Sequence, residues 1–366
     1  MSASTSSARP EYSPAAGSPS AGSLSAGALS AGSVSAGSVS AGSPSAGSPS
    51  AGSVSPGSVS AEALSAASFT ISPRGPFSLA EAAAFGFGQR DGRDADGVMR
   101  LAFCVDGYTG QVGVEVRQDA AGDVQAMAFM RPGTDLGTVQ AQVARVLSLD
   151  YDASEFVRIG DRDAVIGRLQ AAAPGLRPPL FYSPYEAAAW SVLSARRPAR
   201  QMMQVRALLS EAHGRVFDLA GQRLAAFPTP GQLLRVGSFP GLGADKMERL
   251  HGVARAALEG RLDVGALKAM GPDTAMAELQ SIKGIGPFYS ALIVVRGTGF
   301  TDVLPVNEPR ALALAAQLYG LDEPLSEAQF RELAQSWRPF RTWAVVLIRA
   351  ASGRLLDSQA APVPAA

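Results

Sequence analysis

Cysteine and histidine are nearly absent from this chain of 366 residues. Cys104 is the single cysteine, so the chain by itself forms neither a disulfide framework nor a four-cysteine zinc or iron–sulfur site. The two histidines, His213 and His251, lie far apart in the sequence, which argues against a histidine-rich metal centre. The residue types that hold transition metals are therefore too few for such chemistry.

Long apolar runs are missing as well. No stretch approaches the roughly twenty uncharged apolar residues that a membrane span needs. The first residues also lack the continuous apolar segment of a signal peptide. We therefore expect an intracellular protein without a membrane span.

A net charge is also lacking, because 32 lysines and arginines balance 32 aspartates and glutamates. This balance gives no sign of a strongly basic nucleic-acid binder. Lysine is scarce, with only Lys246, Lys268 and Lys283, and two of these lie beside glycine-rich turns. Their placement is more informative than the total charge.

The N-terminal part of the chain is rich in serine, alanine and glycine and has almost no large apolar residues. Such a segment buries too little surface to offset the entropy lost on ordering. We therefore expect residues 1–68 to be a disordered tail. We expect residues 357–366 to be a flexible C-terminus.

Globular composition begins near residue 69, and two patterns divide the rest of the chain. Residues 98–131 alternate short apolar runs with Asp-Gly and Ala-Gly, which predicts antiparallel strands between helices at 78–88 and 136–149. After a proline-rich joint, helical segments separated by proline and glycine follow one another. The sequence predicts an α+β domain over 69–178 and an all-α domain over 179–356.

One turn of the second part has the form of a phosphate-binding site. In "LQSIKGIGPFYSALIVV" a helix ends near Ile282, Gly284 and Gly286 form the turn, and Pro287 opens the next helix. Amides at such a turn and helix start attract an anion, and Lys283 adds a positive charge. The alternative is an ordinary tight turn with Ile285 in the core. A second turn, "FPGLGADKMERL", has a similar design and favours nucleic acid.

Several segments in this order resemble the helix-hairpin-helix DNA glycosylase superfamily, and within it the 3-methyladenine DNA glycosylase II branch. They cover most of residues 180–350 and read "SPYEAAAWSVLSA", "FPGLGADKMERLHGVARAALEGRL", "LQSIKGIGPFYSALIVVRGTGFTDVLPVNEPR", "LYGLDEP" and "WRPFRTWAVVLIR". The resemblance implies a helix-hairpin-helix glycosylase domain at 179–356. It also implies a base-excision-repair enzyme that hydrolyses the N-glycosidic bond of a flipped, alkylated purine.

The resemblance assigns the catalytic carboxylate to Glu308. Counting from Gly286 and counting back from "LYG" both reach Glu308, where the family usually has Asp, and a shift by one residue gives Asn307. A carboxylate there would stabilise a sugar with oxocarbenium character. The alternative is that Asn307 caps a helix and Glu308 only favours the positive end of its dipole. The longer Glu side chain is a departure from the family.

The hairpin also indicates which reaction occurs and which residues contact DNA. Glycosylases that cut the strand have a lysine two residues after the second hairpin glycine, where this chain has Phe288, so the resemblance implies a monofunctional enzyme. The predicted DNA contacts are Lys283, Gly284, Ile285, Gly286, Phe288 and Tyr289.

A pocket for the flipped base would be lined by aromatic rings. The candidates are Trp190, Tyr185, Tyr182, Phe181 and Phe288, although aromatic residues at helical spacing are more often part of a core. Many family members have a glutamine where "SARRPAR" here presents Ala195, Arg196 and Arg197, so the base that is removed is left open.

The expected partner is double-stranded DNA containing damaged bases, bound by a monomer in the cytoplasm or on the nucleoid. We expect no cofactor, while a monovalent or divalent cation at the hairpin fits the resemblance. Two alternatives stay open. One is a helix-hairpin-helix protein that binds DNA with little or no catalysis, and the other is a protein-interaction scaffold, which the zero net charge and the long tail favour.

Overall fold

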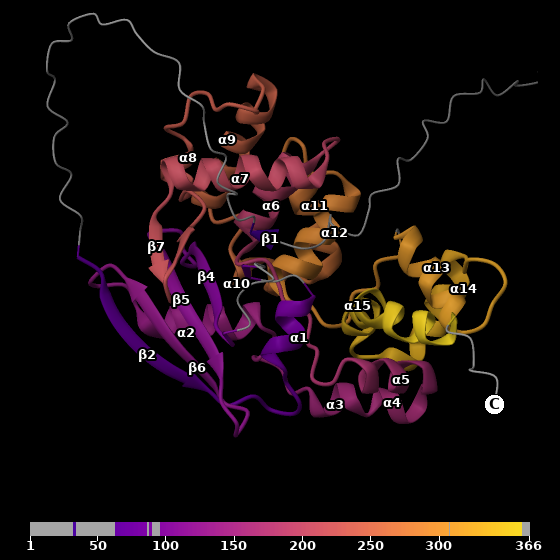
Figure 1. Ribbon diagram of the computed structural model, residues 1–366. Coiled ribbons are helices and arrows are strands. Elements are labelled where there is room, and N and C mark those ends of the chain that lie inside the picture. The colour runs from indigo at the N-terminus through magenta and orange to yellow at the C-terminus, as the bar shows by residue number, and fades with distance from the viewer. Residues whose placement is uncertain (1–31, 34–62, 86–87, 90–95, 307, 361–366) are drawn as a thin grey trace, which may run out of the picture.

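The computed structural model describes residues 32–33, 63–85, 88–89, 96–306 and 308–360. A small antiparallel sheet lies at one side of the molecule, and most of the helices lie beside it (Figure 1). The expectation of a protein that combines helices with a small sheet is confirmed. The division into domains at residue 178 stays a prediction.

The sheet has four antiparallel strands in the order β2-β6-β5-β4. The alternating segment supplies three of them, as predicted: β4 Met99–Cys104, β5 Gln111–Gln118 and β6 Val124–Met130. Two helices flank the strands in the chain: α1 Leu79–Ala84 and α2 Leu136–Val146. Val139, Val143 and Val146 of α2 are buried in the same core as β5 because their spacing places them on one helix face.

The edge strand β2, Ser65–Ile71, corrects the predicted boundary of the tail. Residues 65–68 were expected to be disordered, but they pair with β6, which supplies the hydrogen-bonding partners that the local sequence does not reveal. Within the same predicted tail, β1 (Gly32–Ser33) pairs in parallel with β3 (Gly88–Gln89). The rest of the tail lies outside the described residues.

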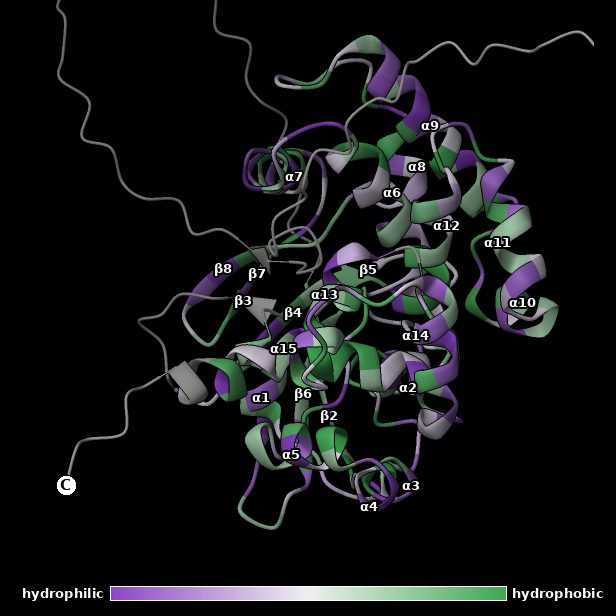
Figure 2. Ribbon diagram, turned by 90° about the vertical axis from the view of Figure 1, so that its right-hand side faces the viewer, coloured by the Kyte–Doolittle hydropathy of each residue, from purple (hydrophilic) through white to green (hydrophobic). Residues whose placement is uncertain are grey.

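One group of helices builds a hydrophobic core beside the sheet, which is called the first core below. Its members are α6 Pro184–Ser194, α7 Ala199–His213, α8 Pro230–Leu233, α9 Ala244–Leu258, α10 Val264–Met270, α11 Pro272–Gln280, α12 Pro287–Ile293 and the π-helix η2 Val294–Thr298. Helix α6 is buried along its whole length and is the centre of this group. Helix α7 has Met202, Val205 and Leu209 in the core, and most of its polar residues lie outside the core (Figure 2).

A β-hairpin interrupts this group, so the expectation of an all-α segment after residue 178 is wrong. Strands β7 (Val216–Leu219) and β8 (Gln222–Ala225) pair across Ala220 and Gly221, which both have positive φ. Phe217 packs against Gly113 of the sheet, where an added Cβ would lie 2.7 Å from its ring. Four-residue strands give too short an alternation to be recognised, and packing on the sheet stabilises them.

A second group of helices joins segments that are far apart in the chain. It contains α3 Ser154–Val157, α4 Ile159–Arg162, α5 Ala164–Ala172, α13 Pro309–Leu318, α14 Glu327–Leu333, the 3₁₀-helix η3 Ala334–Trp337 and α15 Arg341–Ala360. Helices α3 to α5 lie against α13 to α15, away from the sheet (Figure 1). Packing therefore crosses the predicted boundary at residue 178. Helix α15 also continues to Ala360, beyond the predicted end at 356.

The proline-rich joint between the two parts contains a buried arginine. Arg177 is 1% exposed and donates five hydrogen bonds to carbonyls of two separate segments. The acceptors are Pro76 (2.9 Å), Ser148 (3.0 Å), Tyr151 (3.1 Å), Arg74 (2.6 Å) and Gly75 (3.0 Å). Burial lowers the pKa of its guanidinium to about 10. The joint is thus a tightly bonded part of the fold.

Within the described residues, no helix has the length and hydropathy needed to cross a bilayer.

Candidate nucleic-acid interface

The glycine turn between α11 and α12 has the predicted form. Gly284 has φ +101°, a conformation that favours glycine, and the Ile285 amide donates to the Ile282 carbonyl at 3.0 Å. The Ile285 side chain is buried in the first core, as the simple-turn alternative also expects. Gly286 is the N-cap of α12 and Pro287 is in its first turn, so no side chain caps the helix start.

A cavity of about 960 Å³ opens beside this turn. Three segments meet there: the end of α6 with the turn that follows it, the start of α9, and the hairpin. The lining residues are Val192, Ala195, Arg196, Arg197, Pro198, Asp245, Lys246, Arg249, Gly284, Gly286, Phe288 and Tyr289. Four cations and one carboxylate are among them, so a chain of zero net charge presents a local excess of positive charge here.

The arginines of this cavity come from two elements. Arg196 and Arg197 lie in the turn after α6, and Arg196 adopts φ +56°, which is uncommon for a residue other than glycine. Arg249 of α9 pairs with Asp245 at 2.8 Å. Its side chain also lies over Gly284, where an added Cβ would be 3.0 Å from Arg249 Cδ. No sequence pattern indicated Arg249, because the contact depends on how α9 packs against the hairpin.

Lys246 has a structural role that the sequence did not reveal. Its ammonium donates to the carbonyls of Val192 and Leu193 at 2.7 Å and of Ala195 at 3.1 Å, which lie at the C-terminal end of α6. These carbonyls lack partners within the helix, and a cation satisfies them well. Burial lowers the pKa of Lys246, and the charges of Arg197 and Arg249 add to this effect. Lys246 fixes the turn that carries Arg196 and Arg197.

Lys283 differs from Lys246 in its surroundings. Its side chain is 63% exposed and pairs with the exposed Glu248 at 3.1 Å. An exposed pair of this kind contributes little to stability, roughly 0–1 kcal/mol. Lys283 is therefore available to an anion at the hairpin.

The two lysines beside glycine turns should respond differently to removal of their charge. Lys246→Met should lower the free energy of unfolding by about 1–3 kcal/mol, because charged hydrogen bonds to buried carbonyls are lost. Lys283→Met, the matched control, should change it by less than about 1 kcal/mol. Urea denaturation of both variants checks this. Equal stabilities would contradict the capping role of Lys246.

The two hairpin glycines allow a second matched comparison. A Cβ on Gly286 would meet no atom within 4 Å and its φ is −94°, so Gly286→Ala should fold normally. If a phosphate approaches this backbone, the methyl group should weaken binding to duplex DNA about tenfold, whatever the sequence.

Gly284→Ala should instead lower stability, because its φ is positive and Arg249 lies close. Binding titrations and thermal melts of both variants measure this. Unchanged affinity for Gly286→Ala at low salt would show that no backbone contact forms there.

Two aromatic rings of α12 also line the cavity. Phe288 is 40% exposed, and Tyr289 lies beside it with ring centroids 5.3 Å apart. Tyr289 packs partly against the first core, which fixes its ring. Exposed rings beside cations offer stacking surfaces to nucleic-acid bases.

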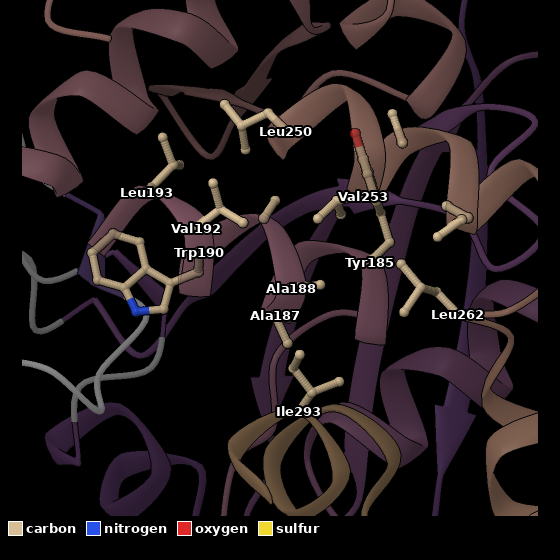
Figure 3. Close-up of a cluster of buried hydrophobic side chains, with 14 of the residues drawn as sticks. Tyr185, Ala187, Ala188, Trp190, Val192, Leu193, Leu250, Val253, Leu262 and Ile293 are labelled. Carbon is tan, nitrogen blue, oxygen red and sulfur yellow. The ribbon is translucent and has the colours of Figure 1, made fainter. Parts of the chain in front are cut away.

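The other predicted pocket residues lie elsewhere. Tyr185, Trp190 and Phe181 are buried in the first core, and Figure 3 shows the rings of Tyr185 and Trp190 among aliphatic side chains. The Tyr185 hydroxyl donates to the Pro228 carbonyl at 2.9 Å. Tyr182 stacks on Phe103 with centroids 5.1 Å apart. None of the four lines the cavity described above, and core packing is the alternative that their helical spacing favoured. As walls of a base pocket they stay a prediction.

Glu308 lies outside the cavity, at the start of α13. It is the N-cap residue, but its side chain makes no capping hydrogen bond, and Pro309 follows in the first turn. The carboxylate instead forms an ion pair with Arg349 of α15, and these side chains are 17% and 10% exposed. Asn307 lies outside the described residues. Helix α12, η2 and the segment after them lead from the hairpin to Glu308.

A second arginine lies near this ion pair. Burial, followed by the positive charge of Arg349, lowers the pKa of Arg296 in η2 to about 10. Burial also lowers the pKa of Arg349. Among the described residues, no group of three or more Cys, His, Asp or Glu side chains has an arrangement that could hold a metal.

Comparisons with known proteins point to one superfamily. The DNA-3-methyladenine glycosylase 2 of Escherichia coli is 30% identical over 196 residues, which are 51% of this chain and 64% of that protein. A Mycobacterium tuberculosis protein named "Probable bifunctional transcriptional activator/DNA repair enzyme AlkA" is 28% identical over 224 residues, 60% of this chain and 44% of that protein. The matches thus span less than two-thirds of the length of either relative. No protein-family model matches the chain.

Solved structures show the same fold. A 3-methyladenine DNA glycosylase from Archaeoglobus fulgidus superposes with a TM-score of 0.64 at 20% identity, covering 78% of this chain and 98% of that one. The chain resembles the helix-hairpin-helix DNA glycosylases in sequence and in fold. An 8-oxoguanine glycosylase/lyase from Clostridium acetobutylicum, solved with double-stranded DNA, gives a TM-score of 0.54 at 17% identity and covers 72% and 87% of the two chains. The resemblance expected from the sequence is confirmed.

Proposed function

We propose that the protein is a monofunctional DNA glycosylase, which hydrolyses the N-glycosidic bond of a damaged, flipped purine in double-stranded DNA. The observation that carries this proposal is the hairpin, whose two glycines open onto a cavity lined by four cations and two aromatic rings. Alkylated purines are the substrates suggested by the names of the relatives. We further propose that it acts as a monomer in the cytoplasm or on the nucleoid.

The hairpin suits a phosphate of the DNA backbone. Gly286 leaves open space at the start of α12, and Lys283 is exposed nearby. Backbone amides and a mobile cation bind phosphate without reading a base, so binding should not depend on sequence. Because cations neutralise phosphates and release counterions, affinity should fall steeply as salt increases. Such a salt dependence would also exclude a pure protein-interaction scaffold.

The proposed chemistry assigns Glu308 to the sugar. As the bond between C1′ and the base lengthens, the base takes the bonding electrons and the sugar becomes positively charged. The Glu308 carboxylate would stabilise this charge and orient the water that adds to C1′. That water loses a proton to the carboxylate or to solvent, and a purine that carries a positive charge from alkylation of a ring nitrogen leaves as a neutral base. The products are a free base and an abasic site.

The lysines of the chain support a reaction without strand cleavage. A covalent route needs an amine at the sugar, but the chain has Phe288 at the position where the resemblance places a nucleophilic lysine. Lys246 caps α6, Lys283 pairs with Glu248, and Lys268 lies 3.8 Å from Asp150. Lys246 and Lys268 are therefore held by protein groups, and the exposed Lys283 is proposed to bind a phosphate.

One experiment tests the proposed activity. Duplexes that carry different damaged bases are incubated with the protein and then heated in alkali, which cleaves DNA at abasic sites. We expect strand breaks only after alkali, and most with alkylated purines. Strand breaks without alkali would contradict the monofunctional assignment. No breaks with any lesion would contradict glycosylase activity.

A second candidate is a DNA-binding protein that has little or no catalysis. The Glu308–Arg349 ion pair favours it, because a cation beside the carboxylate reduces its effect on a developing positive charge. Such a protein would bind duplexes with salt-dependent affinity and leave every damaged base in place. The alkaline-cleavage experiment separates the two candidates.

A further inference from the structure

Glu308 is not held in place by its own helix. At an N-cap position a short polar side chain usually accepts a hydrogen bond from the first turn, but Glu308 makes no such bond. A glutamate also has one more rotatable bond than the aspartate usual in the family, so its carboxylate has more orientations available. Some other group must restrict it if it is to face a sugar in one geometry.

Arg349 is the residue that contacts this carboxylate. It lies on α15, and its guanidinium forms the ion pair with Glu308 while being only 10% exposed. A planar guanidinium presents several donors in a fixed arrangement, which orients a carboxylate better than an ammonium does. Partial burial strengthens the attraction, because less water screens the two charges.

Three other charged residues on these segments do not take the place of Arg349 in the contact with Glu308. Burial, followed by the positive charge of Arg349, lowers the pKa of Arg296 in η2. The Arg296 guanidinium donates to the Pro179 carbonyl and lies over the Phe85 ring, so it has contacts of its own. Asp302, in the connection before α13, is bound by Arg338 and Arg341 and so does not compete for Arg349. Arg310 on α13 itself is exposed.

We infer that Arg349 is a positioning residue for the proposed reaction: it holds the Glu308 carboxylate ionised and in one orientation. The inference rests on the proposed function, because Glu308 is assigned there as the group that faces the sugar. The extra length of glutamate would then be compensated by a partner on α15. If Arg349 merely neutralised Glu308, its removal would speed the reaction, so the two roles predict changes of opposite sign.

The test compares Arg349→Met with Arg349→Lys in single-turnover excision of a damaged base from duplex DNA. Arg349→Met should lower the rate about tenfold or more at neutral pH, and Arg349→Lys should restore part of it because the charge returns. Without the cation, the ionised form of the Glu308 carboxylate is less stable. The pH below which the rate falls (the acid limb of the rate profile) should therefore rise by about one unit in Arg349→Met. Affinity for the duplex should stay within twofold, and thermal melts report folding.

A double-mutant cycle with Glu308→Asp makes the test more specific. If Arg349 restricts the longer side chain, Arg349→Met should cost less activity in the Glu308→Asp chain than in the parent. An Arg349→Met rate that equals or exceeds the parent's would overturn the inference. So would a loss with an unmoved acid limb and no rescue by lysine, which indicates a purely structural role. If Glu308→Gln excises as fast as the parent, the assignment of Glu308 fails and the inference with it, although the glycosylase activity stands. If only Arg349→Met is silent, the assignment of Glu308 stands and the inference alone fails. If the parent itself leaves no alkali-sensitive sites, the proposed function fails.

Discussion

Replacing Glu308 with glutamine should lower the rate of base excision by a factor of about 100 or more, the scale seen when one electrostatic stabiliser is removed. Glutamine keeps the length and shape of the side chain but not its charge, so the sugar cation loses its counter-charge. No lysine at position 288 offers a covalent route around this loss. Single-turnover excision from a damaged duplex measures the effect.

Two controls separate chemistry from binding and folding. Affinity for the duplex should be kept or raised in Glu308→Gln, because the hairpin is untouched and a negative charge is removed. Glu308→Asp should retain or gain activity, since the charge stays and the family usually has aspartate there. A glutamine variant that excises at the parent rate would leave Glu308 as a helix-start residue paired with Arg349.

Replacing Arg177 with methionine should have the largest effect on stability, a loss of about 3–5 kcal/mol in the free energy of unfolding. Five carbonyls would lose their donor, and each buried acceptor without a partner costs about 1–3 kcal/mol before relaxation. Arg177→Lys should recover only a part, because an ammonium has three donors and no planar fork. Urea denaturation or calorimetry gives the values.

Arg354 provides the matched control for this prediction. It also joins two separate elements, through an ion pair with Glu81 at 2.7 Å and a hydrogen bond to the Ala172 carbonyl, but it is exposed. Arg354→Met should therefore lower stability by less than about 1 kcal/mol. Similar losses in both variants would mean that the buried carbonyls around Arg177 find other donors.

Much of the local structure could be predicted because its cause is local. The strands β4, β5 and β6 follow from alternation and Asp-Gly turns, and α6, α9 and α12 follow from their proline and glycine boundaries. Strands β2 and β7–β8 were missed, because their stability comes from the sheet against which they pair or pack. The joint at Arg177 looked like a linker for the same reason: its partners lie in two distant segments.

The features of the candidate site also divide into those with a local cause and those that depend on packing. Glycine spacing marked the hairpin, since only glycine adopts the turn at Gly284 freely, and the same spacing grouped Lys246 with Lys283. Packing decided that Lys246 binds the end of α6 whereas Lys283 stays exposed. Packing also buried Tyr185 and Trp190 in the core and brought Arg249 to the cavity.

The sequence by itself determined the mixed composition of helices and strands, the glycine hairpin and the resemblance to the helix-hairpin-helix DNA glycosylases, because these depend on residue types at short, fixed spacings. Only the tertiary structure decided which cations surround the hairpin and which residue forms an ion pair with Glu308. Arg349 is on a different helix, and no short-range pattern connects the two. Such pairs form when distant elements pack together, and packing depends on the shape and burial of the whole chain.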